Sequence, residues 1–146
     1  MSGTELAFDA ELAAPPERVF AAITEARDLR CWFCDTCESE PRVNGRLLLR
    51  WTRADSSREP FEARWVEFSP PARAAYQGGH VGYPGANAGT VWFEVAAARA
   101  GSHLRVRHEL PAHAGYEPHI SPWQAAWPRA LERLQRHLAP SASPST

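Results

Sequence analysis

Three cysteines, Cys31, Cys34 and Cys37, form the string CWFCDTC, in which a thiol recurs at every third residue. Thiolates at such spacings can hold zinc or an iron–sulfur cluster, or can form a redox pair. Metal sites of this kind usually need four ligands, and the sequence has no second pair of cysteines. On a continuous helix the outer two thiols would also lie about 120° apart around the axis. We therefore predict that the string binds no metal and holds small buried or half-buried side chains, with a redox pair as the alternative.

His108 interrupts an otherwise apolar series of alternating residues in the string LRVRHEL. If that series faces the interior, the imidazole is either a polar anchor or general base in an apolar pocket, or a core histidine bonded to a backbone carbonyl or a tyrosine. No carboxylate has a clear inward position beside it. Neither a catalytic pair nor a nucleophilic triad can be assembled from the sequence, and we assign no catalytic residue.

Aromatic residues could line an apolar pocket around His108. The candidate ligand-binding residues besides His108 are Trp51, Trp65, Tyr76, Trp123 and Trp127. The simpler alternative is that these rings fill the core. The glycine-rich stretch from Gly78 to Gly89 fits no phosphate-binding motif, and we expect it to be a mobile loop near the mouth of the pocket.

Apolar periodicity predicts the elements that would position these residues. Apolar side chains at steps of three and four from Pro122 to Leu138 indicate one long amphipathic helix. Two short helices are expected earlier, one opening at residues 14–17 and one over 27–33. Strands are predicted over residues 5–12, 38–43, 46–52, 61–68, 73–77, 90–97 and 103–110. Asn44-Gly45 predicts a tight hairpin between the second and third strands. This order of elements indicates an α+β fold.

Strand alternation also assigns each side chain to a face of the sheet. The face toward the long helix should carry Leu47, Leu49, Trp51, Phe61, Ala63, Trp65, Ala74, Tyr76, Val91, Phe93, Val95, Leu104, Val106 and His108. The opposite face should carry Arg50, Glu62, Arg64, Trp92, Glu94, Arg105 and Arg107. An exposed Trp92 among these charges is a candidate contact for weak self-association, because large aromatic residues are enriched at interfaces.

The length of 146 residues and the net charge of −1 limit the class of protein. We expect one domain over residues 1–139, followed by a disordered tail of serine and proline over 140–146. The near-neutral charge argues against nucleic acid or an anionic membrane as a partner. No apolar run reaches the roughly 18 residues of a membrane span. The N-terminus has no basic signal region and the cysteines do not pair off, so we expect a cytoplasmic, bacterial protein.

Six local strings occur along the chain in a characteristic order. They are APPERVFAAIT (Ala14–Thr24), PRVNGRLLLRW (Pro41–Trp51), VEFSPPARAAYQ (Val66–Gln77), GTVWFEV, GSHLRVRHEL and AWPRALERLQRHL. Their order and spacing over about Thr4 to Leu138 resemble the START-like, or SRPBCC, superfamily, and within it the branch named after the activator of the heat-shock-protein-90 ATPase. Where that branch usually has a Gly-Trp pair in its closing helix, this sequence has Ala126-Trp127.

The resemblance implies the helix-grip fold, a curved antiparallel sheet of about seven strands around the C-terminal helix, with two short helices after the first strand and a cavity between sheet and helix. It implies no particular reaction, because members include lipid and hormone binders, polyketide cyclases and co-chaperone domains. We expect binding of a small hydrophobic or amphipathic molecule in that cavity, without a cofactor. One alternative is a co-chaperone-like module that contacts a chaperone or a second copy of itself. Another is an enzyme of the cyclase or hydrolase type that uses His108, which would need a second polar group within hydrogen-bond reach.

Overall fold

One antiparallel sheet and three helices make up the part of the chain that the computed structural model describes, residues 4–50, 61–80, 89–110 and 117–139. In chain order the elements are β1 (Thr4–Leu12), α1 (Pro16–Thr24), α2 (Ala26–Trp32), β2 (Thr36–Ser39), β3 (Arg46–Arg50), β4 (Phe61–Ser69), β5 (Arg73–His80), β6 (Thr90–Ala98), β7 (Gly101–Leu110) and α3 (Glu117–Leu138). The strand order across the sheet is β1-β7-β6-β5-β4-β3-β2. These elements confirm the predicted α+β fold, including the two short helices after the first strand.

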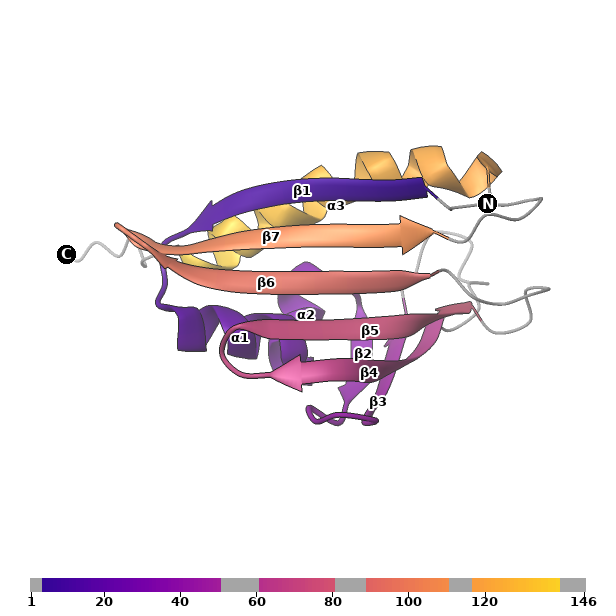
Figure 1. Cartoon of the computed structure of the whole chain (residues 1–146), viewed down its shortest axis with the longest axis horizontal. Coiled ribbons are helices and arrows are strands. Elements are labelled where there is room, and N and C mark those ends of the chain that lie inside the picture. The colour runs from indigo at the N-terminus through magenta and orange to yellow at the C-terminus, as the bar shows by residue number, and fades with distance from the viewer. Residues whose placement is uncertain (1–3, 51–60, 81–88, 111–116, 140–146) are drawn as a thin grey trace.

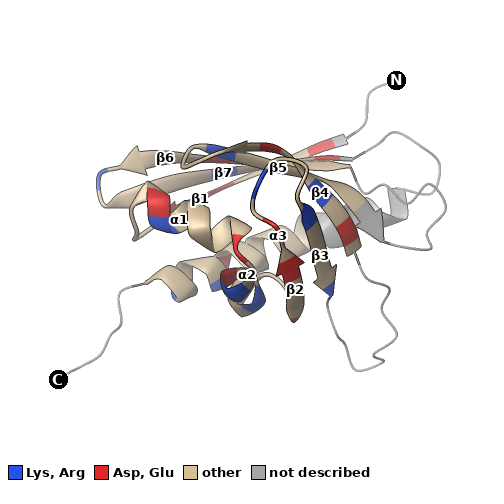
Figure 2. Ribbon diagram, turned by 90° about the horizontal axis from the view of Figure 1, so that it is seen from below, with Lys and Arg blue, Asp and Glu red and all other residues tan. Residues whose placement is uncertain are grey.

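All three helices lie on one side of the sheet (Figure 1). The sheet is curved, and β2 and β3 turn down beside α2 (Figure 2). Helix α3 contacts β1 and α2, whereas α1 packs on β6 and β7. The longest helix therefore lies on the concave face of the sheet, which is the arrangement that the family resemblance implies.

A single apolar stripe fixes α3 on the sheet. Its buried side chains are Trp127, Ala130, Leu131, Leu134 and Leu138. The polar side chains on the opposite face are exposed, namely Arg129, Glu132, Arg133, Gln135 and Arg136. Burying one leucine side chain contributes about 1.5–3 kcal/mol, so burial of the stripe is a large part of what holds the helix in place. Among the described residues, no helix has the length and apolar character needed to cross a membrane.

Helix α3 begins at Glu117, earlier than the predicted start at Pro122. The reason is local, because Pro118 already occupies the first turn, where the missing N–H of proline costs no hydrogen bond. Residues 117–121, which precede the predicted helix, are therefore helical. Residues 111–116 lie outside the described part of the chain.

The tight hairpin predicted at Asn44-Gly45 is also wrong. Strand β2 ends at Ser39, so the connection to β3 is longer than two residues. The Asn44 amide donates to the Trp65 carbonyl at 2.7 Å, and the Trp65 amide donates to the Gly45 carbonyl at 2.9 Å. Asn44 has a positive φ of 65°, as glycine-like turn positions do. The Gly45 amide closes a turn by donating to the Arg42 carbonyl at 2.9 Å, so the dipeptide ends a longer connection and also pairs with β4.

The predicted faces of the sheet are confirmed wherever they can be seen. Every described member of the inward series is buried, and the outward series is exposed or half-buried; Trp51 lies outside the described residues. A β-bulge between Trp65 and Glu67 shifts the pairing of β4 with β5. Residues Gly78–His80 belong to β5 and not to the expected loop, while residues 81–88 lie outside the described part.

Candidate functional site

Five inward-facing residues form one row across the concave face of the sheet. Successive Cα partners run from Leu6 to His108, Val91, Tyr76 and Trp65, which takes the row from β1 to β4. Neighbouring strands are about 4.8 Å apart, so Tyr76 and His108, two strands from each other, are separated by roughly 10 Å. The row therefore brings together three of the predicted site residues.

His108 is held by the helix above it. Its ring is 1% exposed, and the Trp127 indole N–H donates to His108 Nδ1 at 3.1 Å. An indole nitrogen can only donate, so Nδ1 must be the acceptor. The proton of the neutral imidazole then lies on Nε2, which makes that atom a hydrogen-bond donor. The contact with α3 thus sets the tautomer of His108.

Trp127 lies among aromatic rings from β1, β6 and the turn after α2. Its ring centroid lies 5.5 Å from that of Phe33 in a stacked arrangement, 6.2 Å from that of Phe93 and 6.4 Å from that of Phe8. The His108 ring meets it edge-on, at 6.1 Å. Aromatic pairs in this distance range attract each other beyond their burial alone. The surroundings of His108 are accordingly apolar.

Tyr76 supplies the second polar group of the row. Its ring packs edge-to-face against Phe61 and Trp65, each at 5.9 Å between centroids. Burial raises the pKa of the Tyr76 phenol, and the nearby Cys34 thiol adds to this effect. The phenol therefore stays protonated at neutral pH and can donate or accept a hydrogen bond, but it cannot act as a base.

Ser39 is a residue of this region that the sequence analysis missed. The Trp65 indole N–H donates to Ser39 Oγ at 3.2 Å, and the Ser39 hydroxyl donates to the Thr24 carbonyl at 2.6 Å. Ser39 thereby ties the row to the end of α1. No sequence signal marks this contact, because it joins residues of β2, β4 and α1 that only the folded chain brings together.

Small residues follow the row toward the end of the sheet where β7 ends. Ala63 of β4 pairs with Gly78 of β5, one inward position beyond Tyr76. A Cβ atom at Gly78 would collide with the Glu62 carbonyl and with Ala63, so the two strands approach closely there. Gly78 is half-buried although it belongs to the inner face. At this one pair of positions the inner face therefore carries little side-chain volume, between the rings of Phe61 and Trp65 that pack on Tyr76.

The structure brings four of the six predicted site residues together, Trp65, Tyr76, His108 and Trp127. Trp51 lies outside the described residues, and Trp123 belongs to α3 but its side chain is not described. Phe33 and Phe93 also belong to the site, although only Phe93 was in the predicted inward series. The row itself contains no carboxylate, and the Trp127 indole that reaches His108 can donate a hydrogen bond but cannot accept a proton.

The three cysteines lie in different surroundings. Cys31 is exposed on α2, where its thiol donates to the Arg27 carbonyl at 3.3 Å. Cys34 is buried after the end of α2, and Cys37 is half-buried in β2. Among the described residues, no group of three or more His, Cys, Asp or Glu side chains is arranged to hold a metal ion.

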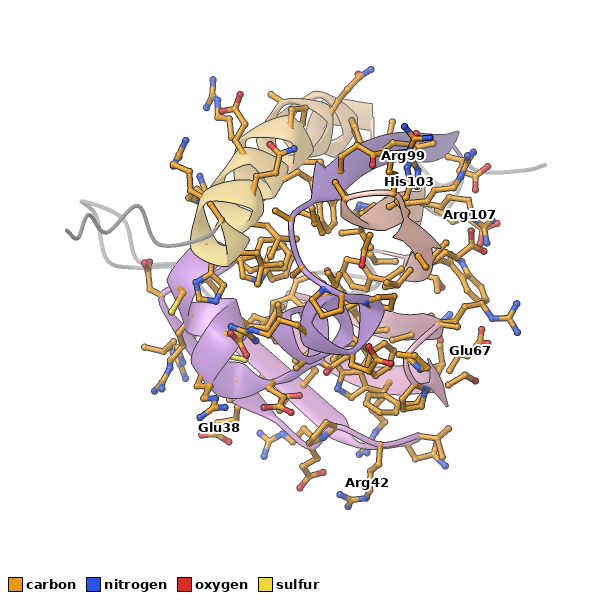
Figure 3. The ribbon with its side chains drawn as sticks, turned by 90° about the vertical axis from the view of Figure 1, so that its left-hand side faces the viewer. Glu38, Arg42, Glu67, Arg99, His103 and Arg107 are labelled. Atoms are coloured by element: carbon orange, nitrogen blue, oxygen red, sulfur yellow. The ribbon has the colours of Figure 1, made fainter. Side chains whose placement is uncertain are left out.

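The outer face of the sheet carries a ladder of charges. The Arg107 guanidinium lies 5.3 Å above the centre of the Trp92 ring and pairs with Glu5 and Glu94. Arg107 and His103 point away from the interior (Figure 3). Arg107 covers part of the Trp92 ring, which is half-buried, so Trp92 is less exposed than we expected.

A curved antiparallel sheet around a long C-terminal helix, with two short helices after the first strand, defines the helix-grip class of the START-like superfamily. The family model "activator of Hsp90 ATPase homolog 1-like protein" matches residues 13–139, and the chain belongs to this family. No curated protein matches the sequence.

Solved structures show the same fold. A protein from Rhodobacter sphaeroides is 22% identical, with a TM-score of 0.79 over 93% of this chain and 92% of its own. A protein from Mesorhizobium loti is 17% identical, with a TM-score of 0.78 over 92% and 96%. The Aha1 dimer from Colwellia psychrerythraea is 13% identical, with a TM-score of 0.76 over 92% and 96%. At these identities, the likeness shows the fold alone.

Proposed function

We propose that the chain binds a small amphipathic molecule between the inner face of the sheet and α3. The observation that supports this most is the row that carries Tyr76 and His108, two buried polar groups in otherwise aromatic surroundings. Binding sites for small molecules are typically apolar, with a few polar groups that fix the orientation of the ligand. The low side-chain volume at Ala63 and Gly78 lies beside this row.

The chemistry of the two polar groups limits the ligand class. Tyr76 is a neutral phenol, and the tautomer of His108 is fixed by Trp127, so both present neutral hydrogen-bonding groups. A ligand with an apolar body and one carbonyl or hydroxyl group would bury its body against the aromatic rings, and its polar atom would join the hydrogen bonds of the row. An anionic ligand would find no arginine in the row to pair with.

Tryptophan fluorescence provides the test, because Trp65 and Trp127 lie in and above the row. A panel of apolar and amphipathic molecules should contain at least one that changes the emission with a saturable titration. Tyr76→Phe or His108→Ala should weaken that binding by about 1 kcal/mol, or roughly fivefold, if a neutral hydrogen bond is lost. Trp92→Phe, on the outer face, is the matched control and should bind with unchanged affinity. If no molecule of the panel alters the emission of the folded protein, the proposal is wrong.

A protein-interaction module is the second candidate function. The Colwellia relative was solved as a dimer, and on this chain the Trp92–Arg107 pair lies within a charged outer face. A second copy or a chaperone would contact that face without using the row under α3. Light scattering of the wild type and of Trp92→Ser should then show association that the variant loses. If both proteins have the same mass in solution, self-association through this face is ruled out.

A further inference from the structure

Cys34 and Cys37 meet where α2 passes into the edge strand β2. Cys34 directly follows the last turn of α2. The Asp35 amide then donates to the Arg50 carbonyl at 2.9 Å, which leads the chain into pairing with β3. Cys37 pairs with Leu49, an inward-facing residue, and therefore shares the inner face of the sheet. The turn thus brings both thiols to the interior side.

The two thiols lie close together but differ in how easily a molecule from solvent can reach them. The Cys34 thiol lies within hydrogen-bonding reach of the Cys37 thiol, and it donates to the Leu29 carbonyl at 3.6 Å. Cys34 is buried within the hydrophobic core, whereas Cys37 packs against its rim and is half-buried. In the described sheet β2 is the last strand, so the half-buried Cys37 lies at an edge of the sheet, whereas Cys34 is enclosed by the core. A small reagent can therefore reach Cys37 first.

The same contact makes the two sulfurs chemically different. The interaction with the neighbouring Cys34 thiol lowers the pKa of Cys37, and Arg30 adds to this against the opposing effects of burial and Glu38. The same interaction and burial raise the pKa of Cys34. Because the thiolate is the nucleophile, Cys37 is the sulfur that attacks, and Cys34 remains a thiol beside it.

We infer that Cys34 and Cys37 form a reactive dithiol that hydrogen peroxide converts to an intramolecular disulfide. The Cys37 thiolate attacks one peroxide oxygen and the O–O bond breaks. Hydroxide departs, and Cys37 becomes a sulfenic acid. The sulfur of Cys34 then attacks the Cys37 sulfur, the S–O bond breaks, and the departing hydroxyl takes the thiol proton to leave as water. The hydroxide of the first step combines with the proton that Cys37 lost on ionisation. The two sulfurs lose two electrons in all, and the peroxide becomes two molecules of water.

Cys31 has the same sequence spacing from Cys34 but a different position. Its thiol is exposed and donates to the Arg27 carbonyl on its own helix. The geometry therefore selects one of the three disulfides that three cysteines allow. This inference is independent of the proposed ligand, since it concerns the end of α2 and the edge of the sheet.

The test is peroxide oxidation of the reduced full-length protein, followed by intact-mass measurement and peptide mapping without reductant. The expected product has lost two hydrogen atoms, carries a bond between Cys34 and Cys37, and returns to the starting mass with dithiothreitol. A product linked through Cys31, or no disulfide under conditions that oxidise free glutathione, would overturn the inference.

Three variants separate the roles of the sulfurs, each with its fold checked by circular dichroism. Cys31→Ala should form the disulfide as the wild type does. Cys34→Ala should stop at a Cys37 sulfenic acid that dimedone traps, and Cys37→Ala should form no disulfide. If Cys34→Ala does not fold, the wild type still tests the inference, because peptide mapping shows which of the three possible disulfides has formed. Dimedone capture on Cys34 of the wild type, in place of Cys37, would contradict the assigned roles.

Discussion

The hydrogen bond between Trp127 and His108 joins the C-terminal helix to the sheet through two buried side chains. Either side chain, buried without the other, would destabilise the folded state, since a buried polar atom that loses its partner keeps its full desolvation penalty. The bond also determines which imidazole nitrogen can donate. At this scale, the site consists of a donor-only indole that orients a histidine, and a neutral phenol two strands away.

Replacing Trp127 with Phe tests that bond. The ring remains aromatic, but His108 Nδ1 loses its donor, and we expect the free energy of unfolding to fall by about 1–3 kcal/mol. Trp92→Phe is the control because Trp92 lies on the outer face, where the phenylalanine ring keeps a weaker contact with Arg107 and the cost should stay below about 0.5 kcal/mol. Urea denaturation measures both. Equal losses of unfolding free energy for the two variants would mean that the buried hydrogen bond stabilises the fold no more than the contact on the outer face does.

The sequence predicts the inward position of His108 but not its partner. Period-two alternation decides the face of a strand residue, whatever the exact bounds of the strand. The row of Tyr76 and His108 depends in addition on the register of several strand pairs, including a pair with a β-bulge. The contact with Trp127 depends on how α3 docks. Neither register nor docking is encoded in the local pattern that the sequence analysis used.

At the scale of elements, Asp28 connects the three helices. Its Oδ1 accepts hydrogen bonds from Arg18 of α1 and from His137 of α3, both at 2.8 Å. The carboxylate is 3% exposed, and its Oδ2 is buried without a hydrogen-bond partner among the described residues. Burial by itself would raise the pKa of Asp28, but the hydrogen bonds from Arg18 and His137 outweigh it and lower that pKa.

The lowered pKa predicts a pH-dependent stability. The contribution of Asp28 is fully present above its ordinary value of 3.8, and it is lost as the pH falls from there through the lower folded-state value. Asp28→Asn should therefore reduce the free energy of unfolding by about 1–3 kcal/mol at pH 7. The difference from the wild type should shrink toward pH 3. Glu132→Gln, exposed on α3, serves as the control. A difference that is the same at pH 7 and pH 3 would contradict the role assigned to Asp28.

His103 connects the edge strand β1 to β7. Its Nδ1 lies 2.7 Å from Glu11 Oε2, and its Nε2 lies 2.7 Å from Asp9 Oδ1. The hydrogen bond to Glu11, and then that to Asp9, raise the pKa of His103 above its ordinary 6.5. The stabilising charge is present below pH 6.5 and is lost as the pH rises through the raised value.

An NMR titration of the imidazole measures this directly. The midpoint of His103 should lie above 6.5, and Glu11→Gln should move it back toward that value. Asp9→Asn should have an effect in the same direction. A midpoint at or below 6.5 in the wild type would show that the two carboxylates do not hold the ring in solution.

Element boundaries show where local patterns stop being informative. The apolar stripe of α3 was predicted because its period is intrinsic to the helix. Its start was not, because three prolines, Pro118, Pro122 and Pro128, all lie within the helix and each could mark a boundary. The two-residue hairpin at Asn44-Gly45 failed for another reason, since the turn there closes back to Arg42 within a longer connection and its backbone also pairs with Trp65 of a later strand.

At the scale of the whole molecule, the concave sheet carries the aromatic side chains and the helix closes over them. The outer face carries exposed ion pairs, which stabilise the fold little individually. The chemically distinctive groups gather on the inner side, Tyr76 and His108 in the row and the Cys34–Cys37 pair near the β2 edge. The proposed ligand binding and the proposed thiol oxidation therefore concern different parts of one concave surface.

Native mass spectrometry of the protein purified from its own host tests the binding proposal most directly. We expect a species heavier than the bare chain by one small molecule, which denaturation releases and which has an apolar body with a carbonyl or hydroxyl group. Tyr76→Phe, purified in parallel, should retain less of it. A bare mass for the wild type under gentle conditions, together with no response in the fluorescence panel, would contradict the account and leave the protein-interaction function as the better one.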